Sequence, residues 1–214
     1  QVALGGRRQE ISVLFADIRG FTSFSERMPP EDLVEILNRY LSLGAQAVLD
    51  YEGTLDKFMG DAIMAFFNAP LAQSDHTLRA VKAALAMQQA ITTYCHELDE
   101  ELHLNFGVGI NVGEAVVGNV GTAKLMNYTA IGDCVNLAKR LQESAEAGQI
   151  LLSQRAYRRV KDFVHVRALE PIQVKGRSAP EPVYELVGLR DTSRASRIST
   201  EGWYKAESPG TDPG

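Results

Sequence analysis

The chain has few of the residues that define several common protein classes. It contains 2 cysteines and 1 tryptophan among 214 residues, and aromatic residues make up 7%. Cys95 and Cys134 do not resemble a disulfide framework or a metal cluster, so we expect two free thiols and a cytoplasmic location. No apolar run approaches the roughly 18 residues that a membrane-spanning helix needs, so no membrane segment is expected.

An excess of basic charge is also lacking. The formal net charge is −5, and the basic residues are scattered among acidic ones, so a nucleic-acid partner is not expected. The first residues do not follow the pattern of a secretory signal peptide, and the chain does not begin with methionine. We therefore expect a part of a longer protein that carries upstream regulatory domains.

The chain does have enough apolar residues, 45%, for one globular domain with a full core. We expect a catalytic domain at 1–190 and a flexible tail at 191–214, where Ser, Thr, Gly and Pro dominate. The order of elements predicts an α+β fold in which helices cover one face of a sheet. Periodicity and turn residues predict strands at 11–15, 54–58, 62–67, 126–131, 149–153 and 182–186, a second hairpin at 104–111 and 114–120, and helices after 20, at 30–51, at 74–97 and after 133.

Two aspartates each lie at the end of an apolar strand, within three residues of a glycine. Asp17 is in LFADIRGFT at 14–22, and Asp61 is in DKFMGD at 56–61. Each has an ordinary alternative as a turn or capping residue. If the fold brings them together, two carboxylates about 4 Å apart repel by about 4 kcal/mol at an effective dielectric constant of 20. A divalent cation is then expected between them, and Mg²⁺ prefers a few carboxylates together with phosphate oxygens.

These two segments and a third, YTAIGDCVNLAKR at 128–140, resemble the catalytic domain of class III nucleotidyl cyclases. The resemblance extends over residues 10–186 and is strongest to bacterial adenylyl cyclases of the soluble, bicarbonate-responsive type. It implies a ferredoxin-like palm sheet covered by helices. It also implies an enzyme that converts ATP to 3′,5′-cyclic AMP and pyrophosphate.

The resemblance assigns a metal-binding role to the two aspartates. Asp17, Asp61 and the carbonyl group of Ile18 would bind two Mg²⁺ or Mn²⁺ ions, with Ca²⁺ as a candidate for one of them. One ion would activate the ribose 3′-hydroxyl, and the other would hold the β- and γ-phosphates.

The same resemblance assigns recognition of the purine to Lys57 and Thr129. A lysine can donate to N1 of adenine, which is an acceptor, whereas guanylyl cyclases carry a glutamate there because N1 of guanine is a donor. Thr129 would accept a hydrogen bond from the 6-amino group, and a threonine here is associated with bicarbonate-stimulated members. From spacing alone, Lys57 could equally be a solvated lysine.

Asn136 and Arg140 are four residues apart, so they share one face of a helix. By the resemblance, Asn136 orients the ribose and Arg140 stabilises charge on the transferring phosphate. An arginine in that role is worth about 10³–10⁵ in rate in other phosphoryl-transfer enzymes. A plain surface pair on an amphipathic helix is the alternative.

Further candidates would contact the phosphates. Gly20, Phe21 and Thr22 open a helix whose free N–H groups suit phosphate oxygens, although Gly20 can also be a simple turn. Lys175 matches a family lysine that contacts the triphosphate. Lys124 is a looser match, and a solvated loop lysine explains it as well.

The positions of Lys57 and Asp61 predict how many subunits form the active site. Lys57 and Asp61 flank a single hairpin, yet they must reach opposite ends of ATP. In the family the metal-binding residues come from one subunit and the other residues from its partner, so we expect a homodimer with two shared sites. Two other functions stay open, a nucleotide-binding regulatory module without turnover and a guanylyl cyclase, which Lys57 disfavours.

Overall fold

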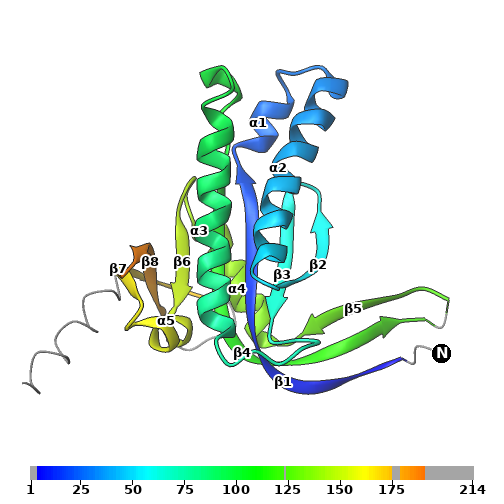
Figure 1. Ribbon diagram of the computed structural model, residues 1–214, viewed down its shortest axis with the longest axis vertical. Helices are drawn as coiled ribbons and strands as arrows, with labels where there is room; N and C mark the ends of the chain where they lie inside the picture. The colour runs from blue at the N-terminus through cyan, green and yellow to red at the C-terminus, as the bar shows by residue number, and fades with distance from the viewer. Residues whose placement is uncertain (1–3, 123, 175–178, 191–214) are drawn as a thin grey trace, which may run out of the picture.

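The computed structural model describes residues 4–122, 124–174 and 179–190. Within them, the chain forms a mixed sheet with helices packed against it (Figure 1). The elements in chain order are β1 Gly5–Arg19, α1 Phe21–Ser25, α2 Pro30–Asp50, β2 Thr54–Met59, β3 Ala62–Phe67, α3 His76–Cys95, a short 3₁₀ helix Glu100–Leu102, β4 Asn105–Gly121, β5 Met126–Ile131, α4 Asp133–Ser144, β6 Ile150–Ser153, α5 Gln154–Val160, β7 Val164–Ile172 and β8 Glu181–Leu189.

The strands of the described residues follow the order β2-β3-β1-β4-β6-β8-β7, and β5 pairs with β4 outside this path. Neighbouring strands are antiparallel except β4 and β6, which are parallel. Figure 1 shows the start of β1, the end of β4 and all of β5 extending together as an arm away from the body. The sheet therefore places the β2–β3 hairpin beside the far end of β1, where the site residues were predicted.

Successive side chains of β1 enter different cores because strand side chains alternate between the two faces of a sheet. Leu14 and Ile18 are fully buried in the core that also contains residues of α2 and α3. Val13 and Phe15 pack into a second core with Ala138 of α4. The predicted α+β class is confirmed, whereas the expectation that helices cover one face is wrong, since α4 lies on the face opposite to α2 and α3.

The predicted hairpin at 104–120 is also wrong, because β4 is one continuous strand in unbroken register with β1. Its glycines allow close packing instead of turns. A Cβ on Gly109 would lie 2.3 Å from the backbone nitrogen of Gln142 in α4. A Cβ on Gly118 would lie 2.1 Å from the carbonyl oxygen of Gly5 in β1.

The predictions for α2, α3, β2, β3 and β5 are confirmed to within about two residues at each end. Three elements, α5, β7 and the short 3₁₀ helix, were not predicted. The predicted tail, 191–214, lies outside the described residues. Among the residues described, no helix has both the length and the apolar character needed to cross a bilayer.

Candidate active site

Asp17 and Asp61 meet at one edge of the sheet, as their positions in the sequence predicted. Asp17 lies near the end of β1, opposite Ala62 at the start of β3. Asp61 lies in the turn that precedes β3, and its carbonyl oxygen accepts a hydrogen bond from the backbone nitrogen of Ile18 at 3.2 Å. The antiparallel pairing of β1 and β3 is therefore what brings the two carboxylates together.

The surroundings of Asp17 disfavour its negative charge. Burial raises the pKa of Asp17 above its usual value, and repulsion from Asp61 and then Glu143 raises it further, while the nearby Arg19 lowers it. Such a site gains from an added cation. Among the described residues, no group of three or more His, Cys, Asp or Glu side chains could hold a metal ion. Two carboxylates fit Mg²⁺ or Mn²⁺ completed by water and phosphate oxygens better than an all-protein cage.

The segment after β1 turns sharply into α1. Gly20 has φ 76°, a left-handed conformation that favours glycine, and it is the N-cap of α1 without a side-chain capping bond. Phe21 and Thr22 form the first turn of this five-residue helix. Contact of this turn with phosphate stays a prediction.

Three predicted substrate residues line one pocket of about 620 Å³. Lys57 comes from β2, Thr129 from β5 and Asn136 from α4, and Val135 and Asn127 complete part of the wall. The ammonium Nζ of Lys57 donates to the hydroxyl oxygen of Thr129 at 3.5 Å. Residues 72 positions apart in the chain thus meet, and their reading of a purine stays a prediction.

Asp56 was not among the predicted site residues, yet it contacts two residues that line this pocket, Lys57 and Thr129. Its side chain is fully buried, one carboxylate oxygen lies 3.3 Å from Nζ of Lys57, and the other accepts a hydrogen bond from the hydroxyl of Thr129. The available signal was an acidic and a basic residue side by side in an apolar strand. Spacing alone could not have revealed that both side chains contact Thr129.

The remaining candidates lie at the surface or outside the described part of the chain. Arg140 on α4 is half exposed and pairs with Glu143 at 2.6 Å. Lys124 is exposed between β4 and β5. Lys175 lies outside the described residues, so its role stays a prediction.

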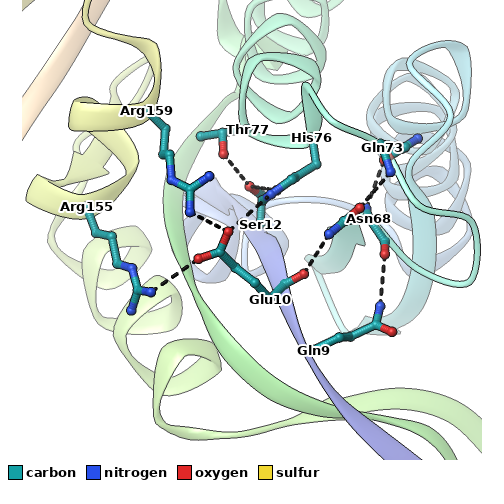
Figure 2. A network of polar contacts seen from close by, with 9 residues as sticks. All are labelled: Gln9, Glu10, Ser12, Asn68, Gln73, His76, Thr77, Arg155 and Arg159. Atoms are coloured by element: carbon teal, nitrogen blue, oxygen red, sulfur yellow. Dashed lines mark hydrogen bonds and ion pairs between the residues drawn. The ribbon is translucent and has the colours of Figure 1, made fainter.

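A second polar cluster contains the serine, histidine and carboxylate of a catalytic triad but cannot act as one. Ser12 Oγ lies 2.7 Å from Nδ1 of His76, and Nε2 of His76 lies 3.6 Å from Glu10 (Figure 2). Ser12 is 0% exposed and His76 is 4% exposed, so no substrate can reach the hydroxyl. Glu10 also binds Arg155 and Arg159 of α5. The cluster joins β1, α3 and α5 and is structural.

Comparison with known proteins gives consistent matches over most of the chain. The family model described as "Adenylate and Guanylate cyclase catalytic domain" matches residues 5–188. Adenylate cyclase 1 of Rhizobium meliloti (strain 1021) is 36% identical over 192 residues, which are 86% of this chain and 29% of that protein. The chain therefore spans under a third of that relative.

Two solved structures are similar to the same degree. The adenylyl cyclase CyaB from P. aeruginosa has a TM-score of 0.81 and 39% identity, covering 87% of this chain and 98% of that one. The guanylyl cyclase Cya2 has a TM-score of 0.81 and 38% identity, covering 88% and 97%. Overall similarity therefore does not distinguish an adenylyl from a guanylyl cyclase.

Proposed function

This chain belongs to the family of adenylate and guanylate cyclase catalytic domains, and we propose that it converts ATP to 3′,5′-cyclic AMP and pyrophosphate. The observation that carries the choice of ATP is the meeting of Lys57 and Thr129 in one pocket. Lys57 can donate to N1 of adenine but meets a donor at N1 of guanine. Thr129 can accept from the 6-amino group of adenine, and a site that leaves a buried polar group unpaired discriminates strongly.

Asp17 and Asp61 are the residues that would hold two divalent cations, with the Ile18 carbonyl as a further ligand. Their mutual repulsion and the raised pKa of Asp17 support this role. Bound Mg²⁺ or Mn²⁺ would supply the positive charge that acidifies the ribose 3′-hydroxyl and stabilises the departing pyrophosphate. The protein contributes the placement of the two carboxylates at a fixed edge of the sheet.

Asn136 and Arg140 would act on the ribose and phosphates of a nucleotide whose metal ions are held by the partner subunit. Both residues are exposed on α4, which leaves them accessible to a second chain. Arg140 would exchange its ion pair with Glu143 for phosphate oxygens, which carry more charge. The proposed active unit is thus a homodimer with two equivalent shared sites.

Two rival functions make different predictions. A guanylyl cyclase is favoured by the similarity to Cya2, but it would place a donor of the base against Lys57. A regulatory module that binds nucleotide without turnover would not need Asp17, Asp61 and Arg140 together. The physiological regulator, whether bicarbonate, Ca²⁺ or an upstream domain, is a separate question.

A competition assay tests the proposal. The purified chain is given equimolar ATP and GTP with Mg²⁺ or Mn²⁺, with and without bicarbonate, and both cyclic nucleotides and pyrophosphate are quantified by chromatography. Cyclic AMP should predominate, Asp61→Asn should abolish it, and the exposed Asp162→Asn should keep it. Predominant cyclic GMP would support the guanylyl cyclase, and nucleotide binding without either product would support the regulatory module.

A further inference from the structure

Asp56 and Lys57 are consecutive residues of β2 whose side chains interact with the same partner. In a regular strand, consecutive side chains point to opposite faces of the sheet. The pairing of β2 with β3 shifts register between Leu55 and Lys57, which is a β-bulge at Asp56. A bulge breaks the alternation and redirects a side chain. It explains how both Asp56 and Lys57 contact Thr129.

The hydrogen bonds around Thr129 have a defined direction. A hydroxyl has one proton to donate and two lone pairs to accept with. The proton of Thr129 is donated to a carboxylate oxygen of Asp56. One lone pair faces Lys57 at 3.5 Å, which leaves the other for a ligand in the pocket.

This direction matters because a hydroxyl alone cannot tell adenine from guanine. The 6-amino group of adenine is a donor, and the 6-oxo group of guanine is an acceptor. A threonine whose hydroxyl could rotate would accept from the first and donate to the second. A carboxylate that retains the hydroxyl proton removes the second option.

We propose that Asp56 is a positioning residue that sets purine selectivity, because it fixes the Thr129 hydroxyl as an acceptor toward position 6 of the base. The inference rests on the proposed function, in which Thr129 reads that position. It also assigns a use to a buried charge. The Asp56 side chain is 0% exposed, and its Oδ1 makes no hydrogen bond among the described residues beyond the ion pair with Lys57.

The test compares kcat/KM for ATP and for GTP in the dimeric protein. Asp56→Asn replaces the carboxylate by an amide that can donate as well as accept, so the Thr129 hydroxyl can reverse. The ratio of kcat/KM for ATP over GTP should fall about tenfold, as expected for losing one oriented hydrogen bond. Asp162→Asn makes the same chemical change at an exposed position and should leave the ratio unchanged. An unchanged ratio in folded Asp56→Asn overturns the inference.

Two changes at Thr129 separate this role from a purely structural one. Thr129→Val keeps the shape and removes the hydroxyl, so it should lower the ratio by about the same tenfold. Adding Asp56→Asn to Thr129→Val should then change the ratio by less than about twofold, because the residue acts through the hydroxyl. If the ratio instead falls about a further tenfold in the double variant, Asp56 acts through Lys57. Thr129→Val also keeps the inference testable if Asp56→Asn does not fold, since an unaltered ratio there overturns it.

A rescue variant should change the ratio of kcat/KM in the opposite direction, back toward ATP. An aspartate at position 129 has no proton to orient, so Thr129→Asp in the Asp56→Asn background should restore the preference for ATP. Failure of a folded double variant to do so counts against the inference. If the unaltered protein makes neither cyclic nucleotide or prefers GTP, the proposed function fails and this inference with it. If the unaltered protein prefers ATP and Asp56→Asn keeps that preference, only the inference fails.

Discussion

Two inactive variants of this protein should restore each other when they are mixed. In the proposed dimer, each site takes Asp17 from one subunit and Arg140 from its partner. Asp17→Ala and Arg140→Ala should each inactivate both sites of their own homodimer. A mixed dimer carries both defects in one site and neither in the other, so one site is intact.

The expected recovery follows from counting sites. Free exchange of equal amounts makes about half of the dimers mixed, and each has one working site of two, so activity should return to about one quarter of the unaltered protein. Purified mixed dimers should reach about one half. Both substitutions should leave the fold intact, because the Arg140 side chain is 50% exposed and Asp17 carries an unfavourable charge.

The assay uses different affinity tags on the two variants. Sequential purification on both tags isolates mixed dimers and proves subunit exchange, and cyclic AMP formation is then measured at saturating ATP. The matched control mixes Asp17→Ala with Asp61→Ala. Both changes affect the metal-binding half, so each site of that mixed dimer lacks one carboxylate and no activity should return.

Two results would refute shared sites. The first is the absence of activity in purified mixed dimers of Asp17→Ala and Arg140→Ala. The second is equal recovery in the control pair, since that would show restoration without an intact site. The first result would move Arg140 into the same site as the aspartates of its own subunit, where Glu143 lies near both Arg140 and Asp17.

Other predictions concern stability. Gly109→Ala should cost about 1–3 kcal/mol in urea unfolding by forcing α4 off the sheet, whereas Gly188→Ala, with nothing within 4 Å of its Cβ, should change stability by less than about 0.5 kcal/mol. The pKa of Asp17 is raised in the folded state, so its charge destabilises the metal-free fold at neutral pH. Asp17→Asn should therefore raise the melting temperature measured in chelator, by about 2–4 °C for each kcal/mol of destabilisation that it removes. Added Mn²⁺ should raise the melting temperature of the unaltered protein only. Burial lowers the pKa of His76, so the unfolded state takes up its proton first, and stability should fall as the pH drops through about 6.5. His76→Gln should weaken that pH dependence in thermal unfolding.

The elements predicted well from the sequence are those whose own residues determine them. In α2, the buried positions Tyr40, Leu41, Gly44, Ala47 and Val48 recur at helical spacing, and Pro30 lies at its start. The β2–β3 hairpin has a tight glycine turn between two short strands. Such signals are local, so one sequence carries them without knowledge of the rest of the fold.

The errors share a different cause, which is that distant neighbours decide the local structure. A turn was predicted between 111 and 114, yet β4 continues through it in register with β1. Its glycines Gly109 and Gly118 lie where α4 and the start of β1 approach too closely for any side chain. The short α5 is held by burial of Ala156 and Val160 against the main core. The same limit hid Asp56, because its role depends on a bulge and on a strand more than seventy residues away.

This protein has two partly buried polar clusters, one of Glu10, Ser12 and His76 and the other of Asp56, Lys57 and Thr129. They differ in a way that indicates where ligands bind. In the cluster of Glu10, Ser12 and His76, the polar groups find partners within the protein. Three buried side-chain atoms among the described residues lack a hydrogen bond, on Arg19, Asp56 and Gln88. The first two belong to the strands that carry Asp17 and Lys57. Unmet polar groups destabilise a fold unless a ligand completes them. Their location beside the proposed metal and purine contacts favours nucleotide binding at these two places over any function of the satisfied cluster.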